Sequence, residues 1–63
     1  IQDIQFEQFR DLEIFCEAAA HSLEEEAELL TGDKGFYNNA LLALEKLRQE
    51  GYNPELKVIL VRP

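Results

Sequence analysis

The side chains best suited to chemistry in this chain are three carboxylates and an imidazole that recur at helical spacing. Glu17, His21, Glu24 and Glu28 follow one another at intervals of three or four residues, so a helix would place them on neighbouring turns of one face. Metal sites in helical bundles use such side chains, but there they point into the core from several helices. Here they lie opposite the apolar residues, so we expect a solvated acidic face and no bound metal.

The chain lacks a convergent set of acid, base and nucleophile. Cys16 has no basic neighbour that would favour its thiolate and no histidine within one helical turn, so we expect a small buried residue there. Tyr37, Asn38 and Asn39 can form hydrogen bonds, but no general base or oxyanion donor accompanies them. We therefore expect a protein that is not an enzyme and that has no cofactor and no small-molecule substrate.

One short motif indicates a different class of function. Gly32, Asp33, Lys34 and Gly35 form a GxxG element between two expected helices. It resembles the GxxG loop of KH-type RNA-binding domains, which also lies between two helices and clamps the nucleic-acid backbone. The resemblance covers four residues and implies a nucleic-acid-binding module that uses this turn. A glycine that ends one helix, followed by the flexible first turn of the next, explains both glycines more simply.

The charge distribution disfavours nucleic acid as a partner. The net charge is −7, and the residues up to Asp33 carry ten acids against Arg10 alone, whereas the later residues carry five bases and three acids. Phosphate backbones and anionic membranes would be repelled by most of this surface. No apolar run reaches the ~20 residues that span a bilayer, so we expect no membrane association. The carboxylates also permit a third alternative, an acidic inhibitor that is antitoxin-like or mimics DNA.

The length of 63 residues predicts a single small domain, 1–63. A chain near this size buries only about 60% of its unfolded surface, and one cysteine cannot form an internal disulfide. Partner chains are the remaining source of stability, so we expect a homo-oligomer, a dimer first of all, or a complex with another protein. The lone thiol favours the cytoplasm. Because the first residue is Ile1 instead of Met, we expect a trimmed, processed or partial chain.

The longest apolar pattern predicts a helix over about residues 5–31. Its apolar positions are spaced three or four residues apart. They are Phe9, Leu12, Cys16, Ala19, Leu23, Ala27 and Leu30. Gly32 would supply the left-handed residue that ends the helix, and Asp33 would cap the next one. A turn at 32–33 is so short that the two helices should pack as an antiparallel hairpin.

A second helix and a strand complete the expected fold. The second helix covers about residues 34–50, with Phe36, Ala40 and Leu44 on its core side and Gly51 at its end. Residues 55–62 predict a strand, because they include four consecutive apolar and mostly β-branched residues. The expected fold class is therefore mainly α, an antiparallel two-helix hairpin followed by a C-terminal β-strand. It becomes α+β if the strand pairs with residues 1–6 or with a second chain.

The expected strand makes association with another chain the favoured function. A single strand cannot satisfy its own backbone groups and would otherwise be an aggregation-prone edge. We expect a non-catalytic protein–protein interaction or oligomerisation module, an adaptor or regulator that acts through helical packing and strand addition. The expected interface residues lie on the strand and off the main helical stripes. They are Ile14, Leu42, Leu56, Val58, Ile59, Leu60 and Val61.

Overall fold

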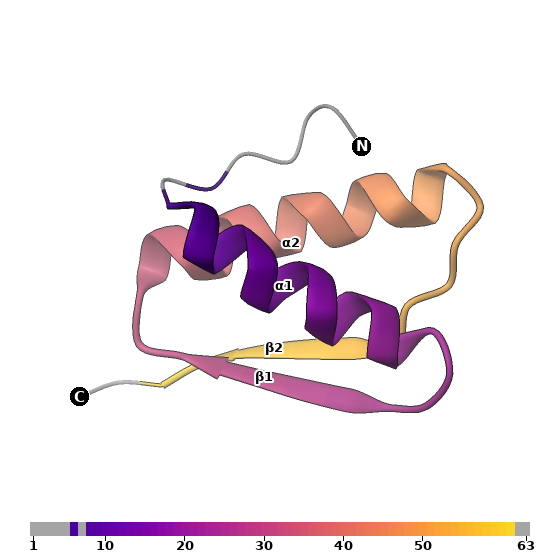
Figure 1. Ribbon diagram of the computed structural model, residues 1–63, viewed down its shortest axis with the longest axis horizontal. Helices are drawn as coiled ribbons and strands as arrows, with labels where there is room; N and C mark the ends of the chain where they lie inside the picture. Colours follow the sequence, from indigo (N-terminus) through magenta and orange to yellow (C-terminus); the bar gives the residue numbers. More distant parts are fainter. Residues whose placement is uncertain (1–5, 7, 62–63) are drawn as a thin grey trace.

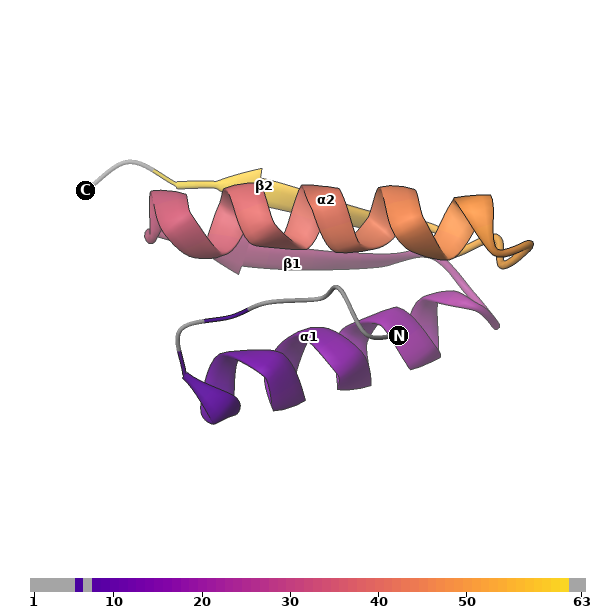
Figure 2. The same ribbon diagram turned by 90° about the horizontal axis from the view of Figure 1, so that it is seen from above.

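The structure is a computed structural model that describes residues 6 and 8–61. Its elements follow one another in the order helix, strand, helix, strand (Figure 1). They are α1 (Phe9–Ser22), β1 (Ala27–Thr31), α2 (Lys34–Gln49) and β2 (Leu56–Leu60). Both helices lie over one face of a two-stranded sheet, α1 mainly over β1 and α2 mainly over β2 (Figures 1 and 2).

The predicted fold class is wrong, because the last part of the predicted first helix is a strand. β1 pairs with β2 in parallel, with the register running from Ala27 opposite Leu56 to Thr31 opposite Leu60. A strand therefore joins the two helices instead of a short turn, and both helices run from left to right in Figure 1. The internal partner of the C-terminal strand is β1, while the expected pairing with residues 1–6 lies almost wholly outside the described residues.

α1 ends at Ser22 because of hydrogen bonds within its last turn and because the following residues pair with β2. The backbone N–H groups of Glu24 and Glu25 both donate to the carbonyl oxygen of His21, which closes the last turn. A longer helix would place Glu24 and Glu28 one turn apart, where like charges repel. Residues 27–31 instead bind β2, and this pairing satisfies backbone groups that a short exposed segment would leave to water.

The buried face of α1 differs in part from the predicted stripe, because Phe15 and Ser22 are buried in place of Cys16 and Leu23, while Ala19 belongs to both. Phe15 and Ala19 are buried, whereas Phe9 is 72% exposed and Leu23 is 49% exposed. The difference follows from the shorter helix, because Leu23, Ala27 and Leu30 no longer belong to it and cannot define its buried side. Phe6 packs on this face, with its ring centroid 5.4 Å from that of Phe15 and in tilted geometry.

The prediction of α2 is confirmed, and chemical signals mark both of its ends. The Asp33 carboxylate accepts hydrogen bonds from the backbone N–H groups of Gly35 at 2.8 Å and Phe36 at 3.3 Å. Gly51 adopts a φ of 99°, and the Tyr52 N–H donates to the Leu47 carbonyl at 3.0 Å. This is the Schellman arrangement, which satisfies the last carbonyls of a helix and turns the chain away.

The core fills the layer between the two helices and the inner face of the sheet. Its α2 members are two large side chains, Phe36 and Leu44, and two alanines, Ala40 and Ala43, which let the backbones approach closely. The buried apolar side chains are Phe15, Ala19, Phe36, Ala40, Ala43, Leu44, Leu56 and Val58. The sheet therefore contributes to the core through one face alone.

Candidate interaction surface

No helix or further strand among the described residues covers the face of the sheet opposite the helices. Side chains alternate along a strand, so the burial of Leu56 and Val58 against the helices places Lys57 and Ile59 on the other side. The register sets Glu28 beside Lys57 and Leu30 beside Ile59. We call this surface the outer face and define it by the residues Glu28, Leu30, Lys57, Ile59 and Val61.

The outer face is apolar at the carboxyl end of the strands. Leu30 is 60% exposed, Val61 is 43% exposed, and Ile59 is half-buried between them. Single exposed apolar residues are ordinary on protein surfaces, but adjacent ones on a regular element form a patch that can bind a partner. Parallel sheets in proteins are almost always covered on both faces, whereas the described residues of this chain cover only one face.

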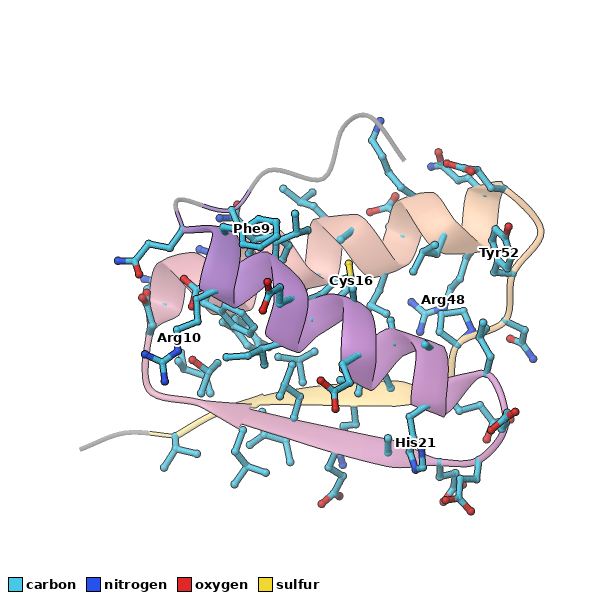
Figure 3. The ribbon with its side chains drawn as sticks, viewed as in Figure 1. Phe9, Arg10, Cys16, His21, Arg48 and Tyr52 are labelled. Carbon is cyan, nitrogen blue, oxygen red and sulfur yellow. The ribbon has the colours of Figure 1, made fainter. Side chains whose placement is uncertain are left out.

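The surface around the amino end of the strands is acidic, while the outer face itself carries Glu28 beside Lys57 there. A shallow hollow there is lined by Glu26, Glu28, Glu55, Lys57 and Arg48, among others. The Arg48 guanidinium reaches back towards the chain entering β2 and donates to the Pro54 carbonyl at 3.4 Å (Figure 3). The preceding turn adds the exposed carboxylates Glu24 and Glu25, so five acids stand against two bases.

β2 has a free backbone edge. The Ala27 N–H donates to the Glu55 carbonyl at 3.1 Å, and the Val61 N–H donates to the Thr31 carbonyl at 2.8 Å. Because backbone groups alternate along a strand, Leu56, Val58 and Leu60 point theirs away from β1. Within residues 8–61 no further strand pairs with the sheet.

The structure divides the predicted interface residues among several places. Ile14 lies on α1 and is 42% exposed, and Leu42 lies on α2 and is 62% exposed. Ile59 and Val61 belong to the outer face. Leu56 and Val58 are buried, and Leu60 is half-buried, so these three offer backbone groups more than side chains. Their shared role in an interface stays a prediction.

Leu30 is an outer-face residue that the sequence pattern placed elsewhere. The helical stripe assigned it to the core of the first helix, whereas it lies exposed on β1. The available signal was the pair Leu29 and Leu30, because adjacent apolar residues are typical of a strand that has apolar surroundings on both faces.

The predicted acidic helix face is divided between two elements. His21 lies in the last turn of α1, and its Nε2 lies 2.9 Å from the Oε1 oxygen of Glu25, with both side chains more than half exposed (Figure 3). Glu28 belongs to β1 instead of the helix. In the part of the chain that the structure describes, no three Asp, Glu, His or Cys side chains are close enough to hold a metal ion.

The GxxG element spans the connection between β1 and α2 and the first two residues of α2. The Asp33 carboxylate is engaged in capping α2, and the Asp33 N–H donates to the Thr31 hydroxyl oxygen at 3.1 Å. Among the described residues only Gly51 has a positive φ, so Gly32 does not serve as the left-handed helix end expected from the sequence. Gly32 thus lies in the strand-to-helix turn and Gly35 in the first turn of α2. Nucleic-acid binding by this turn stays a prediction.

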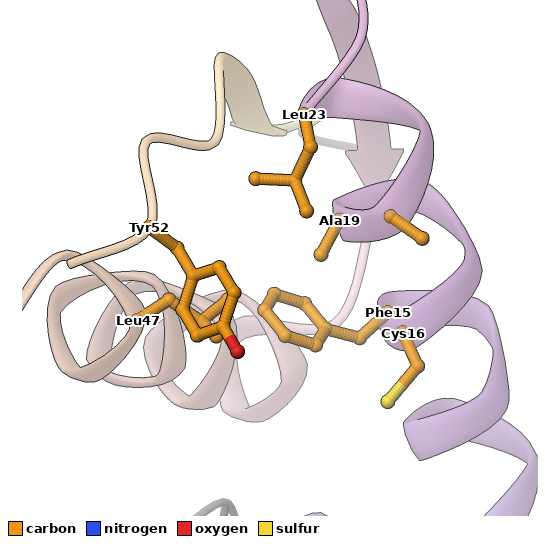
Figure 4. A pocket seen from close by; sticks show the side chains of 7 residues that line it. Phe15, Cys16, Ala19, Leu23, Leu47 and Tyr52 are labelled. Atoms are coloured by element: carbon orange, nitrogen blue, oxygen red, sulfur yellow. The ribbon is translucent and has the colours of Figure 1, made fainter. Parts of the chain in front are cut away.

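Cys16 lies at an apolar groove between the two helices. The groove has a volume of about 190 Å³ and is lined by Phe15, Cys16, Ala19, Ala20, Leu23, Leu47 and Tyr52 (Figure 4). Tyr52 comes from the loop after α2, and its ring stands across the groove from α1 (Figure 4). The thiol is exposed, which corrects its expected burial in the helical stripe.

Neither helix in the described residues is both long enough and apolar enough to cross a lipid bilayer. Comparison of the chain with known protein families, curated proteins and solved structures found no match. The functional argument therefore rests on the surfaces described above.

Proposed function

We propose that this chain is a non-catalytic protein–protein association module that dimerises by pairing the free edge of β2 with β2 of a second copy. The observation that carries the proposal is the parallel sheet of two strands whose second strand ends the sheet. Sheets this small are marginal alone, and an exposed strand edge is a template for another strand.

The β2 edge is better suited to pairing than the β1 edge. β2 points the backbone groups of Leu56, Val58 and Leu60 outward, whereas β1 points only those of Glu28 and Leu30 outward. A two-fold axis through Val58 would pair β2 with its copy in antiparallel fashion, with Leu56 opposite Leu60. This pairing forms about six backbone hydrogen bonds, each worth about 0.5–1.5 kcal/mol.

The resulting dimer would contain one sheet in the order β1, β2, β2, β1, with two helices from each copy over it. Such a unit suits an adaptor or regulator, because its acidic surfaces remain free to contact other molecules. An exposed free thiol at Cys16 suits a reducing compartment, and we assign the protein to the cytoplasm on that ground.

Backbone N-methylation tests the proposal because it removes one N–H group and keeps the side chain. The chain can be assembled from two synthetic segments joined at Cys16. N-methylation of Val58 removes a donor from the β2 edge, and N-methylation of Leu30 is the matched control on the β1 edge. Sedimentation equilibrium at several concentrations measures the dimer dissociation constant, and circular dichroism checks that both products fold.

We expect the unmodified chain to dimerise and N-methyl-Val58 to raise the dissociation constant at least tenfold, since about two hydrogen bonds are lost per dimer. N-methyl-Leu30 should leave the constant unchanged. Pairing through β2 would be overturned if the chain were monomeric at every concentration. It would also be overturned if N-methyl-Val58 and N-methyl-Leu30 raised the dimer dissociation constant equally.

A further inference from the structure

We infer that the outer face of the sheet is a docking surface for a basic amphipathic helix of another protein. This inference concerns the side chains of the outer face and goes beyond the proposed pairing of β2, which uses its backbone edge. The two surfaces share no required contact, so either can exist without the other.

The dimensions of the outer face match a single helix. Each strand has five residues, which corresponds to a length of about 17 Å at the usual rise per residue. The two strands lie about 4.8 Å apart, so with their side chains they form a strip about as wide as one helix, roughly 10 Å. About eleven helical residues would cover that length. Helices are also the elements that normally cover parallel sheets.

The chemistry of the outer face specifies which residues such a helix should carry. Leu30, Ile59 and Val61 require an apolar stripe at helical spacing. The other end of the strands has five acidic side chains, which are Glu28 and its neighbours, and two basic ones, Arg48 and Lys57. Five acids minus two bases leave a net charge of −3 there. The partner should therefore be apolar along one stripe and carry Lys or Arg near the end that meets Glu28.

A second copy of this chain fits the outer face poorly. Two copies packed face to face about an axis along the strands would bring both acidic ends together, so the two excesses of three negative charges would repel. Reversing one copy would instead place its acidic end over the apolar patch of the other and bury unpaired carboxylates, at a large desolvation cost. A basic partner avoids both conflicts.

Pairing through β2 would leave the outer faces accessible. Two copies related by an axis perpendicular to the sheet keep their helices on one side and their outer faces on the other. A dimer would then offer two adjoining docking surfaces, whereas a monomer would offer one.

A synthetic peptide provides the probe. We would use an 18-residue fluorescent peptide with leucines at i, i+3, i+4 and i+7 and with lysines in its final turns. One control peptide carries glutamates in place of the lysines, and a second has the same composition with the leucine stripe scrambled. Fluorescence anisotropy measures the dissociation constant, and ¹H–¹⁵N spectra of the labelled chain locate the peptide.

Two variants and one matched control assign the site. Leu30→Ala should weaken binding about tenfold, because most of a buried leucine contact is lost. Glu28→Lys should weaken binding several-fold at low salt, and the difference should shrink as salt screens the charges. Leu42→Ala is the matched control, because Leu42 is 62% exposed against 60% for Leu30 but lies on α2. It should leave the dissociation constant unchanged.

Four results would overturn the inference. The basic peptide would fail to bind at millimolar concentration, or both control peptides would bind equally well. Alternatively, the spectral changes would fall in the groove between α1 and α2 instead of on the outer face. If Leu30→Ala weakened self-association of the chain, the outer face would be an interface between copies, and a helical partner would be excluded there. N-methyl-Val58 does not alter the outer-face side chains, so a failure of the β2 proposal would be recognised separately.

Discussion

The two faces of the β1–β2 sheet contain similar apolar side chains in opposite environments. On the inner face Leu56 is 5% exposed and Val58 is 8% exposed, whereas on the outer face Leu30 is 60% exposed and Val61 is 43% exposed. Each inner residue removes apolar surface from water when the chain folds, and each outer residue leaves most of its surface in water. The comparison teaches that apolar side chains on the inner face stabilise the fold, whereas apolar side chains on the outer face remain available for contact with a partner.

The largest expected effect comes from shortening an inner-face residue. Leu56→Ala should lower the free energy of unfolding by about 2–5 kcal/mol, because it removes buried methyl groups and leaves a cavity. Urea unfolding followed by circular dichroism measures the change. A chain of this size has little stability to lose, so the variant is expected to be partly unfolded at 25 °C. A loss below about 1 kcal/mol would mean that the inner face is not packed as described.

A glycine pair tests the turn that returns the chain to β2 and sets which residues face inward. Gly51→Ala should cost about 1–2 kcal/mol, because Gly51 has a φ of 99° that a Cβ atom disfavours. Nothing lies within 4 Å of the added Cβ, so the cost comes from the backbone alone. Gly32→Ala is the matched control, since its nearest neighbour would be the Val61 carbonyl oxygen at 3.7 Å. Equal losses from the two variants in urea unfolding would contradict the assigned turn.

The smallest effect is expected on the outer face. Leu30→Ala should change the free energy of unfolding by no more than about 0.5 kcal/mol, because the side chain is already exposed. The same urea titration provides the measurement, ideally on a dilute sample in which copies do not associate. A loss comparable to that of Leu56→Ala would show that the outer face is covered in the folded chain and would remove the contrast between the faces.

The elements with chemical signals at their ends could be predicted from the sequence. α2 has a capping aspartate before it and a left-handed glycine after it, and both act locally as expected. β2 and the residue after it include four consecutive apolar residues, Val58 to Val61, which few helices of a small domain could bury. These features depend on neighbours within a few residues and therefore hold without knowledge of the tertiary structure.

β1 could not be predicted in the same way, because its partner lies far along the chain. Leu23, Ala27 and Leu30 fit a helical stripe, while Ala27, Leu29 and Thr31 fit the alternation of a strand. Pairing with β2 decides between these patterns, and that interaction is tertiary. The candidate surface could not be predicted either, because Leu30 lies beside Ile59 only when β1 and β2 pair in the parallel register.

The free edge of β2 also determines how its amide hydrogens exchange with solvent. In a single copy the N–H groups of Lys57, Ile59 and Val61 are bound to β1, while those of Val58 and Leu60 face water. Deuterium should therefore replace alternate amides along the strand at different rates, fast at even-numbered residues and slow at odd-numbered ones. Any strand that joins this edge would protect the even-numbered amides and remove the alternation. The exchange rate of each amide therefore reports whether a partner strand is bound at that position.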